Sequence, residues 1–230
     1  MHPGGMMDPL AGSPWSAPGT VAGFATSPPN ETLMRFAAGE LARVPGGRAI
    51  DIGCGAGRNA VPLAEQGWVV LGTDWSLPMI EAATLRAAGP PGRLRLALAP
   101  MDALPAGDEE FDLVIAHGIW NLAESAAEFR RGVAEAARVA RPGAGLFVFT
   151  FSRHTLPPAV QPVACEPFVF TEFSGRRQVF LTDDQLFSEL AAAGFIADAA
   201  VPLTEHNRPA AGSLHTGRAP VIYEAAFRRA

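Results

Sequence analysis

Three glycines at alternate positions follow a short apolar segment near the start of the chain. Residues 49–67 read AIDIGCGAGRNAVPLAEQG, in which Asp51 lies within the apolar segment and Gly53, Gly55 and Gly57 come next. Because glycine has no Cβ, it adopts backbone conformations that other residues avoid and lets a ligand approach the main chain. An Ala- and Leu-rich helical pattern follows. The stretch therefore predicts a strand, a tight ligand-contacting turn and a helix.

Strand and helix patterns alternate over the first two thirds of the 230-residue chain. The expected strands are RAIDIG, WVVLGTD, RLRLALA, FDLVIAHG and AGLFVFTFS, and two closing strands lie within 196–203 and 219–229. Short strands that are apolar on both faces, separated by helices, are typical of a mostly parallel sheet covered on both sides. We expect an α/β fold with a Rossmann-like, doubly wound sheet of seven strands that includes an antiparallel edge strand.

Composition excludes several kinds of chemistry. The chain has no lysine, so all 18 basic residues are arginine, and neither a Schiff base nor a phosphate-loop lysine is possible. With Tyr223 as the single tyrosine, a tyrosine–lysine dehydrogenase pair is excluded as well. Two cysteines, Cys54 and Cys165, cannot build a disulfide framework or a four-cysteine zinc site, and we expect no metal.

Charge and hydropathy bear on partners and location. The net charge of −5 is scattered over the chain, which disfavours a nucleic-acid partner because phosphates usually meet a basic face. No apolar run approaches the ~20 residues that span a bilayer, and the N-terminus lacks a basic region followed by an apolar core. We expect a cytoplasmic protein that does not contact membranes.

The glycine spacing distinguishes between cofactors. A dinucleotide-binding turn follows G-x-G-x-x-G, and its third glycine would fall at Arg58. The sequence instead reads D-x-G-x-G-x-G from Asp51 to Gly57. A nicotinamide or flavin oxidoreductase is therefore disfavoured.

The stretch DIGCGAG resembles motif I of the class I S-adenosylmethionine-dependent methyltransferases. GTDWS, MDALP, FDLVIAHGIWNL and ARPGAGLFVF resemble the later motifs of this family in order and spacing. The resemblance covers residues 45–151 well, 152–230 in outline and 1–30 not at all. The C-terminal part is similar to the small-molecule branch that includes tellurite- and thiopurine-type enzymes. The resemblance implies S-adenosyl-L-methionine as cofactor and S-adenosyl-L-homocysteine as product.

The resemblance also implies roles for individual residues. Asp74 would bind the ribose hydroxyls, and as a carboxylate at the tip of the next strand it can accept from both of them. Asp102 would lie near the adenine amino group, and His117 near the methyl-bearing sulfur; His117 is equally well explained as a hydrogen-bonded histidine at a strand end. The candidate cofactor residues are Asp51, Gly53, Cys54, Gly55, Gly57, Asn59, Asp74, Trp75, Met79, Met101, Asp102, Ala103 and His117.

Acceptor recognition is expected in the variable parts of the chain, which include Phe24. The candidates are Trp15, Trp120, His154, Phe168 and Phe170. Trp120 has an alternative as a side chain packed under the following helix. No catalytic residue is assigned, because transfer from a sulfonium mainly requires alignment and the exclusion of water, and a base is needed only if the acceptor must lose a proton.

These patterns divide the chain by function. We expect a flexible N-terminal lead-in over 1–30 and a single methyltransferase domain over 31–230, with a cofactor half (45–151), an acceptor-loop region (152–182) and a closing helix and strands (183–230). The predicted activity is methyl transfer to a small-molecule acceptor by in-line displacement, in a monomer or homodimer. The alternative is a regulator or partner subunit that binds S-adenosylmethionine without turnover.

Overall fold

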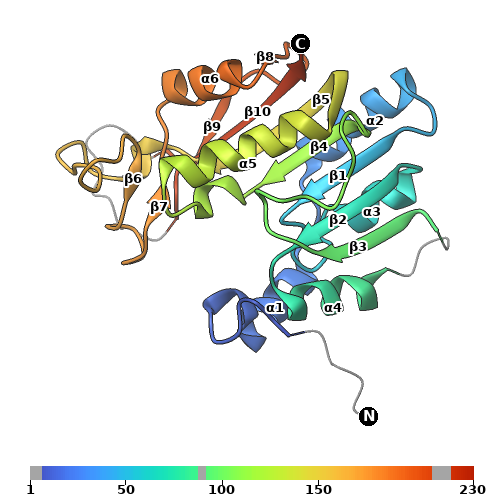
Figure 1. Cartoon of the computed structure of the whole chain (residues 1–230), viewed down its shortest axis with the longest axis horizontal. Coiled ribbons are helices and arrows are strands. Elements are labelled where there is room, and N and C mark those ends of the chain that lie inside the picture. Colours follow the sequence, from blue (N-terminus) through green and yellow to red (C-terminus); the bar gives the residue numbers. More distant parts are fainter. Residues whose placement is uncertain (1–6, 88–91, 209–218) are drawn as a thin grey trace.

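A single twisted sheet dominates the computed structural model, which describes residues 7–87, 92–208 and 219–230 (Figure 1). Its strands run in the order β3-β2-β1-β4-β5-β10-β8, and β9 pairs separately with β10. The strands are β1 Arg48–Ile52, β2 Val69–Asp74, β3 Leu94–Leu98, β4 Phe111–His117, β5 Ala140–Phe151, β8 Phe195–Ala197, β9 Thr204–His206 and β10 Ile222–Arg229. The neighbouring strands β1 to β5 pair in parallel, as the sequence predicted.

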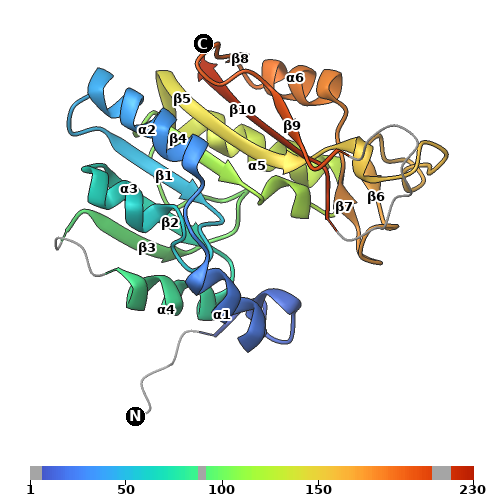
Figure 2. The same ribbon diagram turned by 180° about the vertical axis from the view of Figure 1, so that it is seen from behind.

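Helices cover both faces of this sheet. Figure 2 shows α2 and α3 in front of one face, and α5 and α6 cover the opposite face in Figure 1. The helices are α1 Pro18–Thr26, α2 Glu31–Arg43, α3 Ala60–Gln66, α4 Leu77–Arg86, α5 Ala126–Val139 and α6 Asp183–Ala192, with short 3₁₀ turns η1 Pro14–Ser16, η2 Trp120–Leu122 and η3 Arg153–Thr155. The doubly wound, Rossmann-like α/β fold is confirmed.

The sheet has one hydrophobic core on each face, because side chains along each strand point to the two faces in turn. In β4, Leu113 and Ile115 pack with α2 and α3, whereas Val114 and Ala116 pack with α5. Successive Cβ atoms of a strand point to opposite faces, so a central strand with helices on both sides must be apolar at nearly every position. This requirement explains why the strands could be recognised from the sequence.

All antiparallel pairing in this sheet lies on the β10 side, and the terminal strand β8 is an antiparallel edge strand, as the sequence predicts. β10 pairs antiparallel with β5, at Tyr223 opposite Thr150, and also with the short edge strand β8. Six consecutive residues of β10, 222–227, are buried. β10 is therefore an interior strand, and the three-residue strand β8, which carries the exposed Ile196, forms this edge of the sheet.

Three helices begin at a short polar side chain that caps them. Asn30, Ser76 and Thr182 each accept a hydrogen bond from the backbone N–H three residues later. Such a cap satisfies one of the four N–H groups that a helix start leaves without a partner. These short polar side chains therefore fix where α2, α4 and α6 begin.

Residues 7–30, here called the N-terminal strap, differ from the expected lead-in because they contain η1 and α1. Asp8 Oδ1 accepts from Leu77 N at the start of α4, at 3.0 Å. Arg86, at the other end of α4, donates to the carbonyl oxygens of Phe24, Ala25 and Ser27. Polar anchoring of this kind is invisible to hydrophobic periodicity, which is why composition suggested a lead-in without elements.

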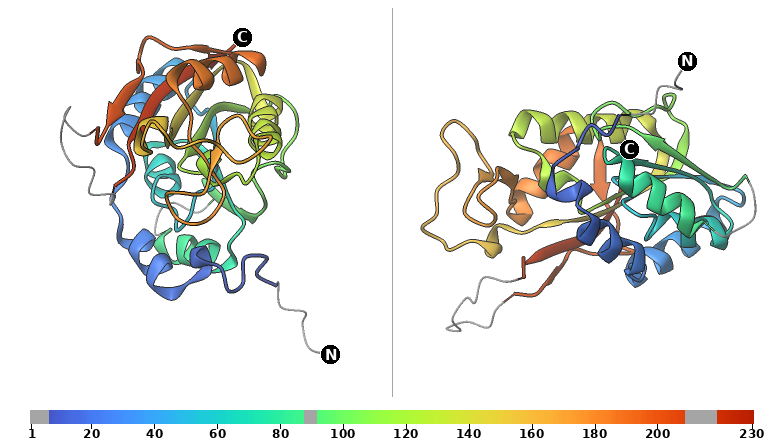
Figure 3. Two further views of the ribbon diagram at one scale, coloured as in Figure 1. Left: turned by 90° about the vertical axis from the view of Figure 1, so that its left-hand side faces the viewer. Right: turned by 90° about the horizontal axis from the view of Figure 1, so that it is seen from below.

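Residues 152–182 form a compact segment with one small hairpin, β6 Val169–Phe170 and β7 Gln178–Val179. Phe170 and Phe180 pack edge to face within it, with ring centroids 6.0 Å apart. The left view of Figure 3 looks onto the carboxyl ends of the parallel strands, where both this segment and the strap lie. Within the described ranges, no helix is long and apolar enough to cross a membrane.

Candidate functional site

The glycine turn leaves the sheet at the carboxyl end of β1, between β2 and β4. Gly53, Gly55 and Gly57 all have positive φ, at 69°, 52° and 74°. A Cβ on Gly53 would stand 2.7 Å from the side chain of Ile119, so no larger residue fits there. A Cβ on Gly55 would meet only Phe24 of the strap and the Met79 sulfur, both beyond 3.5 Å. Gly55 therefore has room for a Cβ but for little more beneath the strap, and it lines the small cavity described below.

Asp74 ends β2 and lies against the glycine turn. Its Oδ2 accepts from Gly55 N at 2.9 Å, and its Oδ1 accepts from Ser76 N at 2.8 Å. Burial raises the pKa of Asp74 above its ordinary value, and the backbone N–H donors oppose that rise. Each carboxylate oxygen retains a lone pair. The side chain is thus held by the backbone with capacity for two further hydrogen bonds.

Asp51 is the buried acid of the site. Only 1 % of the residue is exposed, and its Oδ2 has no hydrogen-bond partner among the described residues. Burial and the nearby charge of Asp74 raise the pKa of Asp51 to about 7. Burying an unpaired carboxylate is costly unless a cation or donor meets it. This oxygen is therefore the clearest unmet polar contact at the glycine turn.

A small cavity of about 90 Å³ lies over the turn. Its walls include Gly53, Gly55 and Asp74 from the strand ends and His117 from the end of β4. The strap closes it with Trp15 and Phe24, whose rings meet edge to face at 6.3 Å. The N-terminal strap, expected as a lead-in, is thus a wall of the site.

A larger cavity of about 490 Å³ adjoins the first. Both are lined by Leu10, Trp15, Trp75, Ile119 and Leu122, so these side chains separate them. The larger cavity also reaches Met101 and Asp102, which follow β3, and Arg176 from the segment after β5. Leu10, Ile119 and Leu122 were not singled out from the sequence, because isolated apolar residues outside a periodic pattern carry no signal of their own.

His117 is held in place by its neighbours. Its ring stacks on that of Phe149, with centroids 4.1 Å apart and planes 9° from parallel. Burial, helped by the charge of Arg58, lowers the pKa of His117 to about 3. The imidazole is therefore neutral over the physiological range.

Among the remaining predicted cofactor residues, Asp102 lines the larger cavity, whereas Cys54, Gly57, Asn59 and Ala103 line neither cavity. Cys54 is buried and faces Gly72 of β2, and Gly57 packs against Val61 and Ala83. Asn59 Oδ1 accepts from Asn30 N at 3.0 Å. Asp102 is paired with Arg131, Nε to Oδ2 at 3.0 Å, and the exposed Ala103 follows it. Their part in cofactor binding stays a prediction.

Four of the five predicted acceptor residues lie away from the cavities. Trp120 and Phe168 are buried on either side of Phe129, with centroids 6.0 Å and 5.4 Å from it. Phe170 is buried in the segment after β5, and His154 lies on the surface, where it contacts Glu205 at 2.6 Å. Large aromatic residues bury most area in a core, and sequence alone does not tell a core wall from a ligand wall. Trp15 alone lines the site.

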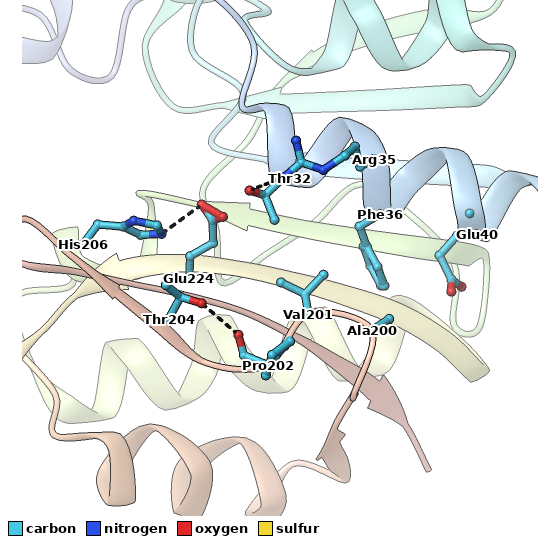
Figure 4. Close-up of a pocket in the computed structure, with 11 residues that line it drawn as sticks. Thr32, Arg35, Phe36, Glu40, Ala200, Val201, Pro202, Thr204, His206 and Glu224 are labelled. Atoms are coloured by element: carbon cyan, nitrogen blue, oxygen red, sulfur yellow. Dashed lines mark hydrogen bonds and ion pairs between the residues drawn. The ribbon is translucent and has the colours of Figure 1, made fainter.

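A third hollow, of about 450 Å³, lies elsewhere, between α2 and the β9–β10 pair (Figure 4). Phe36, Val201 and Glu224 are among its walls, and the glycine turn is not. Among residues 7–87, 92–208 and 219–230, no cluster of three or more His, Cys, Asp or Glu side chains could hold a metal ion.

The chemistry of the residues at the turn is compatible with S-adenosylmethionine, the cofactor that the sequence resemblance implies. The Asp74 carboxylate, which lines the small cavity beside Gly55, has the lone pairs that ribose hydroxyls need. Asp51 has an unpaired buried oxygen but lines neither cavity, so its contact with the ammonium stays a prediction. Ligand pockets typically measure about 300–1,000 Å³. The 90 Å³ cavity is smaller, so the side chains between it and the 490 Å³ cavity must move apart to admit the cofactor.

Comparison with known proteins points the same way. A family profile described as "Methyltransferase domain" matches residues 50–149. A demethylmenaquinone methyltransferase of Clavibacter sepedonicus is 31% identical over 220 residues, covering 87% of this chain and 85% of that protein. A ubiquinone/menaquinone biosynthesis C-methyltransferase of Geotalea daltonii is 28% identical over 188 residues, or 72% and 77% of the two chains.

Solved structures share the fold. The 1,6-didemethyltoxoflavin-N1-methyltransferase of Burkholderia thailandensis, solved with S-adenosylhomocysteine, superimposes with a TM-score of 0.61 at 22% identity, covering 87% of this chain and 79% of its own. The sheet, the glycine turn and the near full-length relative agree with one another. The chain belongs to the class I S-adenosylmethionine-dependent methyltransferases.

Proposed function

We propose that the protein methylates a small, planar, largely apolar acceptor, with a quinol-type ring as the leading candidate. One structural observation carries the proposal: the side chains that lie between the cavity at the glycine turn and the larger adjoining cavity are aromatic or aliphatic, among them Trp15, Ile119 and Leu122. Walls of this kind suit a flat apolar molecule better than a charged one.

The relatives support the same class of acceptor. Two that each cover more than two thirds of this chain carry names in menaquinone or ubiquinone biosynthesis. The sequence resemblance had suggested the tellurite- and thiopurine-type branch. Because the relatives are named for quinone precursors, we place the acceptor among phenolic or quinol rings instead.

The chain's own residues would contribute binding, orientation and exclusion of water. Asp51 and Asp74 would hold the cofactor's ammonium and ribose, and the sulfonium of the bound cofactor supplies the methyl group. Trp15 and Phe24 would hold the acceptor ring and keep water out. Alignment of this kind is worth about 7–11 kcal/mol in favourable intramolecular reactions. Asp74 and His117 are the titratable groups among the described walls of the small cavity.

These two groups are poorly suited to remove a proton from the acceptor. The Asp74 carboxylate already accepts two backbone N–H groups, and the pKa of His117 is lowered to about 3 by burial. General-base catalysis works best when the base has a pKa near the working pH. An acceptor that is already nucleophilic, such as an electron-rich ring carbon beside a hydroxyl or an ionised phenol oxygen, fits this site.

The test is turnover with the purified full chain and S-adenosylmethionine. Three acceptors are compared: a reduced naphthoquinone lacking the ring methyl group, a thiopurine and tellurite, with S-adenosylhomocysteine quantified by chromatography. We expect product with the naphthoquinol alone, and mass spectrometry of the product then identifies the methylated atom.

Two results would contradict the proposal. Turnover with the thiopurine or tellurite would restore the branch suggested by the sequence. Cofactor binding without turnover of any phenolic or quinol acceptor would favour the alternative of a non-catalytic S-adenosylmethionine-binding regulator. Asp74→Ala serves as the control, because turnover through this site must fall with it.

A further inference from the structure

Asn30 joins four separate parts of the molecule at the edge of the site. Its Oδ1 accepts from Leu33 N at 2.8 Å, which caps α2. Its backbone N–H donates to Asn59 Oδ1, just after the glycine turn. Its Nδ2 lies 3.1 Å from Glu224 Oε2 of β10 and 3.3 Å from His117 Nε2 of β4. No part of this side chain is left without a partner.

These partners determine the orientation of the Asn30 amide. Leu33 N–H can only donate, so the atom that faces it must be the oxygen. The NH₂ group then faces Glu224 and His117, and the reversed amide would set an oxygen against the Glu224 carboxylate. An NH₂ group has two hydrogens, one for each of these acceptors. His117 Nε2 must therefore accept, which leaves the ring proton on Nδ1.

We propose that Asn30 is a positioning residue that holds His117 in its Nδ1–H form, with Nε2 occupied as a hydrogen-bond acceptor. The proposal goes beyond the methyl acceptor suggested above and does not depend on it. It gives Asn30 a role in the active site, although the residue lines neither of the two cavities that the glycine turn and the strap enclose.

Glu224 is the anchor of this arrangement. The residue is 5 % exposed and lies between α2 and His206 of β9, whose Nε2 is 3.8 Å from Glu224 Oε2 (Figure 4). A buried carboxylate attracts the Asn30 NH₂ group and opposes its reversal. Because a reversed amide would lose this contact, the Asn30 NH₂ group keeps one hydrogen directed at His117.

The elements packed near His117 carry further charged or titratable groups. Arg58, next to the glycine turn, adds a positive charge that disfavours a second proton on the ring. Asp74 of β2 lines the same cavity, and Glu224 and His206 lie beyond Asn30. A donor directed at Nε2 favours the neutral ring, because the second proton would have to bind at that nitrogen.

This form of His117 matters for a sulfonium cofactor. An imidazolium in the same cavity would repel a second cation, and low local dielectric would strengthen that repulsion. With Nε2 occupied, His117 also cannot take a proton from an acceptor at that nitrogen. Its contribution is therefore a neutral wall stacked on Phe149, with Nδ1–H as its one donor.

The test is nitrogen NMR of the imidazoles in full-length protein labelled at histidine. The chain has five histidines, and the spectrum of His117→Gln assigns the signal of His117. In the wild type we expect the proton on Nδ1 and no titration of this ring between about pH 5 and 8, since a burial-shifted histidine lies outside that window. A proton on Nε2 in the wild type would overturn the proposal.

Two variants separate the two roles of Asn30, the NH₂ group that faces His117 and the side-chain oxygen that caps α2. Asn30→Ser keeps a side-chain oxygen that caps α2 but removes the NH₂ group, so His117 should leave the pure Nδ1–H form. The double variant Asn30→Asp with Glu224→Gln exchanges the two functional groups at constant total charge. It offers Nε2 an acceptor, so the proton should move to Nε2 and the ring should titrate at a higher pH.

Glu224→Gln alone is the matched control. Its amide oxygen can still accept from Asn30, so His117 should keep the proton on Nδ1. An unchanged His117 signal in both Asn30→Ser and the double variant would refute the proposal. The measurement needs neither cofactor nor acceptor, so it is independent of the turnover test of the proposed function.

Discussion

Residues 49–117 and residues 152–182 both carry side chains that the sequence singled out, but the structure uses them differently. In the first region Gly53, Gly55 and Asp74 converge at the ends of adjacent strands and line one cavity. In the second region Phe168 and Phe170 are buried among other aromatic side chains instead. The strap, which precedes both regions in the sequence, supplies the aromatic wall with Trp15 and Phe24.

The difference arises from how each region is constrained. Parallel strands end at the same edge of a sheet, so residues that follow them are brought together whatever the rest of the chain does. No comparable rule of sheet geometry brings the side chains of residues 152–182 together. Their packing depends on contacts with neighbouring segments. A ligand role can be inferred from position in the first region, and only from contacts in the second.

The largest expected effect tests the second region. Phe168→Ala should destabilise the protein by about 3–5 kcal/mol, because it empties a buried site between Phe129 and the guanidinium of Arg130. Urea unfolding measures this change, and calorimetry should find the affinity for S-adenosylmethionine unchanged in the folded variant. If the stability is unchanged and the KM for the acceptor rises, Phe168 lines the acceptor site. The contrast drawn between the two regions would then be wrong.

Gly55→Val tests the first region. The substitution forces a β-branched residue to φ 52° and fills the space beneath Phe24, so we expect at least a hundredfold loss of cofactor affinity, about 2.7 kcal/mol. Gly46→Val is the control, since Gly46 has φ 75° and open surroundings. Normal binding by the Gly55 variant, or equal loss in both, would show that the turn does not contact the ligand.

Asp74→Ala should weaken cofactor binding by at least about tenfold, or 1.4 kcal/mol, because the ribose hydroxyls lose a charged acceptor. Titration calorimetry with S-adenosylmethionine and S-adenosylhomocysteine measures it, and both ligands should lose affinity alike, since they share the ribose. Asp183→Ala, at the exposed start of α6, is the matched control. Unchanged affinity would refute the assigned role of Asp74.

Asp51→Asn should have opposite effects on stability and binding. Between the unfolded pKa near 3.8 and the folded pKa of about 7, the unfolded state ionises and the folded state does not, so rising pH destabilises the wild type up to that point. At pH 8 the variant should be more stable by about 1 kcal/mol or more, yet bind S-adenosylmethionine more weakly.

Thermal unfolding at pH 5 and pH 8 checks this prediction. The stability gain of Asp51→Asn should be smaller at pH 5, and the cofactor should raise the melting temperature of the wild type more than that of the variant. A gain that is equal at both pH values would mean that Asp51 is not the titrating group.

Much of the fold and part of the site could be predicted from the sequence. The caps Asn30, Ser76 and Thr182 and the glycine turn are local features whose physics needs only neighbouring residues. The second role of Asn30 could not be predicted. Its contacts to His117 and Glu224 span 87 and 194 positions in the chain, and no local pattern encodes such a meeting.

The sequence by itself determined the order of the strands and helices between residues 45 and 151 and the edge of the sheet where the site lies, because backbone geometry and hydrophobic periodicity act over a few residues. The cofactor class followed from the resemblance of its motifs to a known family. The tertiary structure alone decided which aromatic residues form walls and which form core. It also decided that the strap closes the cavity and that Asn30 faces His117. These outcomes depend on contacts between distant segments, which exist only after the chain has packed.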